Sequence, residues 1–189
     1  MSKRQLISRQ VPLLIVWLIL SGLIWSYVFN IINDTDAAHK LTIYADTEVR
    51  ESTRLNLFLE EGRGEGIRMV RVHPFTYAMM SSEELTHADL YIMTESDLTA
   101  YAEWLTPVPD SLREGRILWT DADGKPCGIR LTGCYDAALG WFPYAGDETL
   151  WLAFGGKSLH LSGADSAVDN EAEACALRLL SIPGPDEKP

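Results

Sequence analysis

The sequence has little positive charge, and that charge is unevenly placed. Its 189 residues include 16 Lys and Arg against 27 Asp and Glu, which gives a formal net charge of −11. Lys3, Arg4 and Arg9 are the only charged residues before Asp34, so residues 34–189 carry −14. Phosphate backbones and anionic lipid headgroups repel a domain of this charge. We therefore expect no nucleic-acid partner, and we expect the domain to stand off the membrane surface.

The sequence also lacks the motifs of common catalytic and metal sites. It has neither a glycine-rich phosphate loop nor a nucleophile elbow. Its four histidines have no Cys, Asp or Glu partner at metal-ligand spacing. Each histidine is predicted to be a polar surface residue or a strand-end residue; they are His39, His73, His87 and His160. We therefore expect a protein that is not an enzyme and that holds no cofactor and no metal.

Cysteine is scarce, with three residues in the chain. Cys127 and Cys134 are close enough in sequence to form a disulfide if the domain faces an oxidising exterior. Two free thiols are the alternative, and the sequence leaves both open. Cys175 lies among alanines of a predicted helix, where we expect it to be a small core residue.

Charge is absent from the segment between Val11 and Ile32, which reads VPLLIVWLILSGLIWSYVFNII. About 20 apolar residues in a helix span a hydrocarbon core of about 30 Å. Basic residues precede the segment and acidic residues follow it, which places the N-terminus in the cytoplasm. The sequence therefore predicts a single-pass protein of the cell membrane, with a cytoplasmic N-terminus (residues 1–10), a bilayer anchor (11–32) and a linker (33–39).

A cleaved signal peptide is the alternative interpretation of this segment. A weak small-residue cleavage pattern occurs around Thr35-Asp36-Ala37. The apolar region of a signal peptide is usually about 7–15 residues long, which is shorter than this one. The length therefore favours an uncleaved anchor that holds an extracytoplasmic domain.

Residues 40–182 are predicted to form an α/β domain, followed by a disordered tail at 183–189. Strands are expected at 41–45, 67–72 and 88–93, with helices at 46 or 47–61 and at 81–87 between them. This alternation is typical of a three-layer domain with a mostly parallel sheet and covering helices. Further strands are expected at 116–120, 129–132 and 149–154, and a last helix begins at 167 or 168 and ends before Pro183.

Aromatic residues are dense in one part of the second half. The group comprises Trp141, Phe142, Tyr144 and Trp151. Such residues can form a ligand site or a protein interface. The alternative, which we favour, is that they fill the core of the domain.

Four segments of the predicted domain stand in a characteristic order. Lys40–Ala45 is a first strand, and Ala88–Ile92 is a strand with an Asp before apolar residues. Asp123–Ile129 has the pattern "DGK-x-x-GI", and Gly156–His160 has the pattern "K-S-x-H". In this order the segments resemble the extracellular, type 2 periplasmic solute-binding proteins of ABC transporters: their opening strand, a strand that carries an Asp, the segment near the crossing between the two lobes, and the turn after the returning strand.

The resemblance covers residues 40–182 but departs from the family in two ways. Only residues 130–148 separate Ile129 from Thr149, where a two-lobed member inserts a whole lobe, and Arg130 stands where the family has proline. The chain therefore resembles the first lobe alone. This implies a non-enzymatic, membrane-anchored solute-binding-like domain that takes a small-molecule solute and is an accessory to an ABC transporter. The alternative is a structural or interaction module that kept the fold without the ligand and docks to a membrane protein.

A solute site in this fold is expected at the carboxyl ends of the parallel strands. The candidate ligand-binding residues there are Asp46, Thr47, Phe75, Thr94, Glu95 and Ser96. The alternative for each of them is an ordinary role as a cap or turn residue.

Overall fold

The structure is a computed structural model of the chain. It describes residues 3–33, 35–46, 49, 52–75, 83–131, 141–142, 149–161 and 170–181. The chain divides into two compact units, Met1–Asp36 and Ala37–Pro189. Residues 37–39, expected at the end of the linker, belong to the second unit, where they form the 3-10 helix η1 (Ala37–His39).

The first unit contains one long apolar helix, α1 (Lys3–Asn33). Its segment Val11–Phe29 is long and apolar enough to cross a membrane. A helix that is apolar on every face is typical of a membrane span, so α1 has the properties of an anchor.

The second unit is an α/β domain. Its strands are β1 (Lys40–Ala45), β2 (Met69–Pro74), β3 (Leu90–Thr94), β4 (Leu105–Thr106), β5 (Leu118–Thr120), β6 (Pro126–Arg130) and β7 (Leu150–Gly155). Its helices are α2 (Ser52–Glu61), α3 (Glu83–Thr86), α4 (Glu95–Ala100) and α6 (Glu171–Leu180), with the 3-10 helices η3 (Ala102–Trp104) and η4 (Asp110–Leu112). The predicted fold class, α/β with an apolar N-terminal helix, is confirmed.

The seven strands of the described residues form one mixed sheet in the order β2-β1-β3-β7-β6-β5, with β4 beside β7. Strand β1 runs parallel to β2 and β3, whereas β7 pairs with β3, β4 and β6 in antiparallel fashion. Strand β5 is antiparallel to β6. Five of the seven strands therefore point in one direction, and β5 and β7 point in the other.

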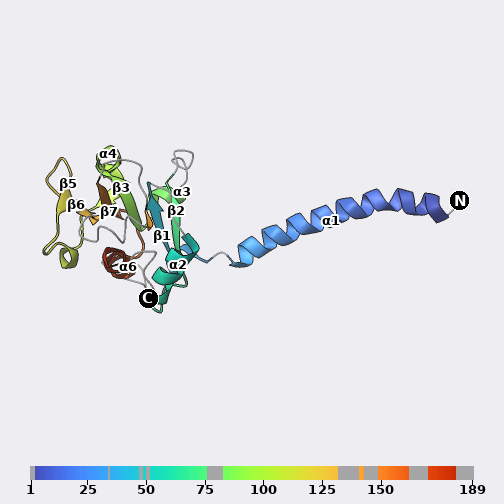
Figure 1. Cartoon of the computed structure of the whole chain (residues 1–189), viewed down its shortest axis with the longest axis horizontal. Helices are drawn as coiled ribbons and strands as arrows, with labels where there is room; N and C mark the ends of the chain where they lie inside the picture. The colour runs from blue at the N-terminus through green and yellow to red at the C-terminus, as the bar shows by residue number, and fades with distance from the viewer. Residues whose placement is uncertain are drawn as a thin grey trace. The chain divides into compact units, whose positions relative to one another are not determined.

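One face of the sheet is covered by α2 and α6, which lie next to each other in Figure 1. Leu55 and Leu59 of α2 are four residues apart, so they share one helix face and pack together in the core. The α6 side of the core is built from small residues, among them Ala172, Ala176 and Cys175. The prediction that Cys175 is a core residue is confirmed.

The opposite face is covered mainly over β3 and β7. Leu85 of α3 and Leu98 of α4 pack there against Tyr91 and Met93 of β3. The beginnings of β1 and β2 are less covered on this face. Every second residue of each strand points to it, and these side chains, such as Thr42 and Arg71, are only half-buried. The domain thus has three layers, with a partly uncovered area over β1 and β2.

The predicted starts of one helix and one strand differ most from the structure. Helix α2 begins at Ser52 instead of residue 46 or 47, because the backbone N–H of Asp46 still bonds to the carbonyl of Ile92 in the sheet. Strand β6 begins at Pro126 instead of Ile129, since proline is tolerated at the first position of a strand. Three predictions lie outside the described residues: the start of the second helix at 81, the start of the last helix at 167 or 168, and the tail.

Three of the four clustered aromatic residues are in the core, as favoured from the sequence. Trp141, Phe142 and Trp151 are 2%, 1% and 7% exposed. Tyr144 lies outside the described residues. The three buried rings therefore contribute no exposed aromatic surface for a partner.

Candidate functional site

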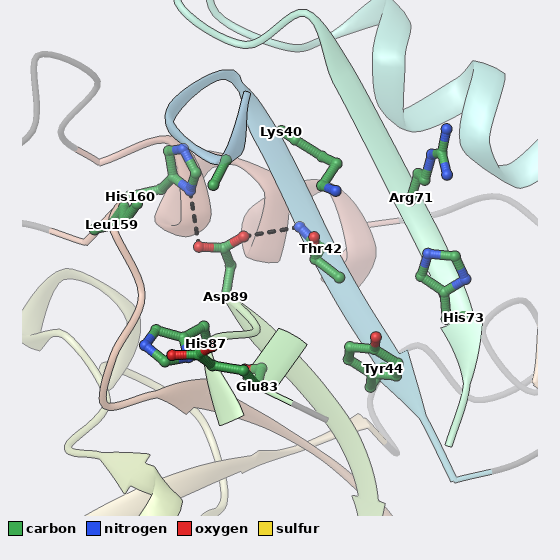
Figure 2. Close-up of a pocket in the computed structure, with 11 residues that line it drawn as sticks. Lys40, Thr42, Tyr44, Arg71, His73, Glu83, His87, Asp89, Leu159 and His160 are labelled. Atoms are coloured by element: carbon green, nitrogen blue, oxygen red, sulfur yellow. Dashed lines mark hydrogen bonds and ion pairs between the residues drawn. The ribbon is translucent and has the colours of Figure 1, made fainter. Parts of the chain in front are cut away.

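A pocket of about 370 Å³ opens on the half-covered face of β1 and β2 (Figure 2). Its lining comes from five parts of the second unit: η1, β1, β2, the segment from α3 to β3, and the loop after β7. The lining residues are Ala37, Lys40, Thr42, Tyr44, Arg71, His73, Glu83, His87, Asp89, Leu159 and His160. The pocket thus mixes cationic, acidic, imidazole and apolar side chains.

The strand register brings the β1 and β2 side chains of this pocket together. Thr42 is paired with Arg71, and Tyr44 is paired with His73. Paired residues on neighbouring strands point to the same face, and alternate residues along a strand do so as well. The rings of Tyr44 and His73 lie 5.5 Å apart between centroids. The period of two that buries Leu41 and Ile43 on one face therefore directs the polar residues into the pocket on the other.

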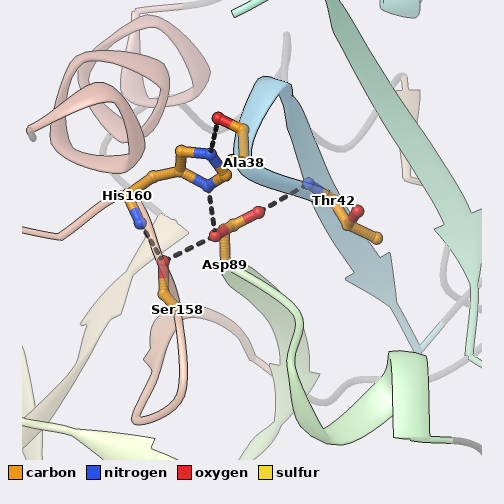
Figure 3. A network of polar contacts seen from close by, with 5 residues as sticks. All are labelled: Ala38, Thr42, Asp89, Ser158 and His160. Carbon is orange, nitrogen blue, oxygen red and sulfur yellow. Dashed lines mark hydrogen bonds and ion pairs between the residues drawn. The ribbon is translucent and has the colours of Figure 1, made fainter. Parts of the chain in front are cut away.

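The back of the pocket is a buried polar network centred on Asp89, shown in Figure 3. One carboxylate oxygen accepts from the Ser158 hydroxyl at 2.6 Å and from Nδ1 of His160 at 2.8 Å. The other oxygen accepts from the backbone N–H of Thr42 at 2.8 Å. Nε2 of His160 lies 3.1 Å from the carbonyl of Ala38. The network therefore connects η1, β1, the start of β3 and the loop after β7.

The partners of His160 determine its protonation. The Ala38 carbonyl can only accept, so Nε2 carries a proton, and an ionised Asp89 requires a second proton on Nδ1. Burial lowers the pKa of His160, but the hydrogen bond and charge of Asp89 and the Ala38 carbonyl outweigh it, so the pKa is raised overall. His160 and Asp89 are therefore a buried imidazolium–carboxylate pair.

Because of this pair, the stability of the protein is expected to decrease as the pH rises. Because the pKa of His160 is raised in the folded state, its stabilisation is complete below about pH 6.5 and is lost as the pH rises through the folded-state pKa. We expect the stability advantage of the native protein over His160→Gln to shrink between pH 6 and pH 8.5. Urea unfolding of both full chains in phosphatidylcholine nanodiscs measures it, and an advantage that is constant or grows with pH would contradict the assignment.

The prediction that every histidine lies at the surface or at a strand end was wrong for His160. His160 is 1% exposed, whereas His87 is exposed and His39 and His73 are half-buried. The reason is Asp89, 71 residues away in sequence, which compensates the buried ring. Among the described residues, no group of three His, Cys, Asp or Glu side chains is arranged to hold a metal ion.

The structure gathers the predicted strand-end residues at one edge of the sheet. Asp46 follows β1, Phe75 follows β2 and donates its N–H to the carbonyl of Ala45, and Thr94 ends β3. Thr47 lies outside the described residues. None of the described residues of this set lines the pocket, so the pocket and the strand ends around Asp46, Phe75 and Thr94 are different places.

Local roles are visible for two of these side chains. Thr94 is buried and caps α4, because its hydroxyl accepts from the backbone N–H of Asp97 at 3.3 Å. The hydroxyl of Ser96 lies 2.9 Å from that of Thr94. Glu95 is exposed in the first turn of the same helix. Thr94 thus has the cap role that was the alternative to ligand binding.

Cys127 is buried in β6, and its Sγ lies 3.8 Å from a carboxylate oxygen of Asp121. Burial raises the pKa of this thiol, and the charge of Asp121 raises it further. Cys134 lies outside the described residues. The disulfide between Cys127 and Cys134 therefore stays a prediction.

Comparison with known proteins gives no relative from which to assign this site. No family model matches the chain, and neither a curated protein nor a solved structure matches it. The function must therefore be argued from the pocket itself.

Proposed function

We propose that this chain is a membrane-anchored extracytoplasmic solute-binding protein, and that its solute occupies the pocket over β1 and β2. The observation that carries the proposal is the pocket, which lies over the partly uncovered beginnings of β1 and β2 and has a buried carboxylate with three hydrogen bonds at its back. Its volume of about 370 Å³ falls within the range of about 300–1,000 Å³ that is usual for small-molecule sites.

The way in which Ser158, Asp89 and His160 are hydrogen-bonded to one another supports binding without catalysis. A serine nucleophile donates its hydroxyl to a histidine base, which a carboxylate then orients. Here the Ser158 hydroxyl bonds to Asp89, and both ring nitrogens of His160 are engaged elsewhere. Ser158 is also buried. The three residues therefore stabilise the wall of the pocket and activate no nucleophile.

The membrane part of the proposal rests on α1 and on the charges that flank it. The segment Val11–Phe29 has the length and hydropathy of a span, and Lys3, Arg4 and Arg9 precede it. On the positive-inside rule the N-terminus is cytoplasmic and the second unit is outside. The resemblance to ABC importer binding proteins adds a membrane transporter as the partner. A mature N-terminus near Ala38, measured by intact mass, would overturn the uncleaved anchor.

The direct test of solute binding is a thermal-shift screen of the full chain in phosphatidylcholine nanodiscs. The panel contains sugars, amino acids, short peptides and small organic and inorganic anions at millimolar concentration. A true ligand raises the melting temperature in proportion to the logarithm of its excess over the dissociation constant. We expect at least one chemical class to shift the native protein, and a panel without any shift would contradict solute binding.

A matched pair of variants assigns such a shift to the pocket. Leu159 lines the pocket and is 44% exposed, and Leu177 of α6 is 47% exposed and does not line it. We expect Leu159→Trp to abolish the shift by filling the pocket, whereas Leu177→Trp should leave it unchanged. Equal loss, or no loss, in both variants would place the solute elsewhere. A protein that kept its fold as an interaction module would show no shift in any variant.

A further inference from the structure

Two basic side chains line the pocket of this acidic domain. Residues 34–189 carry −14, yet the lining includes Lys40 and Arg71 as permanent cations. The two acidic residues of the lining are Asp89 and Glu83. Asp89 is buried and already accepts three hydrogen bonds within the wall of the pocket, so its carboxylate is engaged there. The guanidinium of Arg71 is therefore a cationic contact for a solute in a domain that is acidic as a whole.

The two cations are placed by the sheet. Arg71 is paired with Thr42, and Lys40 precedes Thr42 by two residues on the same face. They are therefore diagonal neighbours, which long side chains can bridge. The Nε of Arg71 donates to the sulfur of Met69 at 2.9 Å. Its terminal guanidinium nitrogens form no ion pair among the described residues, so they are suited to a bidentate contact with a carboxylate or phosphate.

His87 adds a polar group on the opposite wall. Its Nδ1 lies 2.8 Å from the backbone carbonyl of Glu83, which can only accept, so Nδ1 carries a proton. The bond holds the imidazole beside Glu83 and near Asp89, as Figure 2 shows. The carboxylate of Glu83 lies on the same side of the pocket. A solute with one negative charge is therefore favoured over one with two, since Glu83 repels each added charge.

Apolar surface makes up the remainder of the lining. Tyr44, Leu159 and Ala37 contribute carbon atoms to it, and Tyr44 is fixed by its contact with His73. Apolar walls with a few convergent polar groups are typical of sites for small organic molecules. The lining therefore fits a molecule with an apolar part and one anionic group.

We infer that the pocket takes a small organic monocarboxylate, with its carboxylate on the guanidinium of Arg71, next to Lys40, and its apolar part against Tyr44 and Leu159. This inference rests on the proposed function of the same pocket. Phosphate shares the hydrogen-bond chemistry of a carboxylate, so inorganic phosphate is one arm of the test. Neutral isosteres of the carboxylates are the other arm.

The test is isothermal titration calorimetry of the full chain in phosphatidylcholine nanodiscs. The probes are benzoate, benzamide, hexanoate, hexanamide and inorganic phosphate. Each acid and its amide have nearly the same shape, so only the charge differs. We expect at least one carboxylate to bind ten-fold or more tightly than its amide, and to bind more tightly than phosphate.

Arg71→Gln and a matched control separate the charge from the pocket. We expect Arg71→Gln to weaken the carboxylate at least ten-fold and to leave the amide unchanged. Lys125→Gln removes an exposed cation whose ion pair with Asp123 lies outside the pocket, and it should change neither. Melting temperatures of the free proteins identify any variant that is misfolded, and Lys40→Met then provides a second test of the same contact.

The outcomes separate the inference from the proposed function. Amides that bind as tightly as carboxylates, or phosphate that binds more tightly, would overturn the monocarboxylate while Leu159→Trp still abolishes binding. Carboxylate binding that survives both Arg71→Gln and Lys40→Met would overturn the placement of the anion. Absence of binding by every probe, together with a thermal-shift panel without any shift, would overturn the solute-binding function itself.

Discussion

Replacement of Asp89 by alanine is expected to lower the free energy of unfolding by about 3–5 kcal/mol, which is the usual effect of removing one partner of a buried ion pair. The carboxylate is almost fully buried and accepts from Thr42, Ser158 and His160. Its loss leaves the Ser158 hydroxyl and the Thr42 backbone N–H without this acceptor and removes the counter-charge of the buried His160 ring. Small domains are stable by only about 5–15 kcal/mol, so the variant is near the limit of folding.

Asp123→Ala is the matched control for this prediction. The Asp123 side chain is 77% exposed and forms its ion pair with Lys125, whose side chain is 59% exposed. Exposed pairs of this kind contribute about 0–1 kcal/mol. Urea unfolding of the full chains in nanodiscs compares the two. A loss below about 1 kcal/mol for Asp89→Ala would mean that the network does not stabilise the fold in the way described.

Replacement of Gly155 by alanine is expected to destabilise the protein by about 3 kcal/mol, at the upper end of the usual effect of overpacking. A Cβ atom at Gly155 would lie 1.9 Å from the backbone carbonyl oxygen of Ala88. The close approach exists because the N–H of Gly155 donates to the carbonyl of Asp89. Relief of the clash requires β7 and the loop with Ser158 to move away from Asp89, which weakens the same network.

Gly156→Ala tests whether this effect is specific. A Cβ atom at Gly156 would come no closer than 3.3 Å to its nearest neighbour, the carbonyl oxygen of Trp104. A shift of a few tenths of an ångström removes that contact, so we expect a clearly smaller loss of stability. Equal melting temperatures for Gly155→Ala and the native protein would show that β7 does not approach Ala88 so closely.

Much of the fold follows from local patterns in the sequence. The alternation of Leu41 and Ile43 with polar residues predicts β1, and the apolar run from Leu150 predicts β7 as a buried strand. Strand β4 has only two residues, Leu105 and Thr106, and no local pattern indicates it. It forms because the edge of β7 offers it hydrogen bonds, which is a tertiary effect.

The site could be predicted only in part. Asp89 and His160 each lie in a segment that resembles the solute-binding family. Nothing in the sequence around either residue indicates that they form a pair. Their contact joins residues 71 apart and depends on the pairing of β3 with β7. The sequence does give one signal at Asp89. A charged residue directly before a fully buried strand is itself expected to be buried, and a buried carboxylate needs a hydrogen-bond partner.

The pocket could not be predicted, because it depends on where helices cover the sheet. The positions of the strand-end residues depend only on the order and direction of the strands. Asp46, Phe75 and Thr94 accordingly lie at one edge of the sheet. The area over β1 and β2 is partly uncovered because α3 and α4 pack against β3 and β7. The sizes and positions of those helices follow from packing that the sequence pattern does not specify.

The most direct test of the central claim is hydrogen–deuterium exchange of the full chain in nanodiscs, with and without saturating benzoate. Exchange reports local opening, and a bound solute slows it around its site. If the pocket over β1 and β2 is the solute site, exchange will slow in residues 71–73, 83–89 and 159–160 and stay unchanged at the strand ends. Slowed exchange at Asp46, Phe75 and residues 94–96, with no change around the pocket, would contradict it.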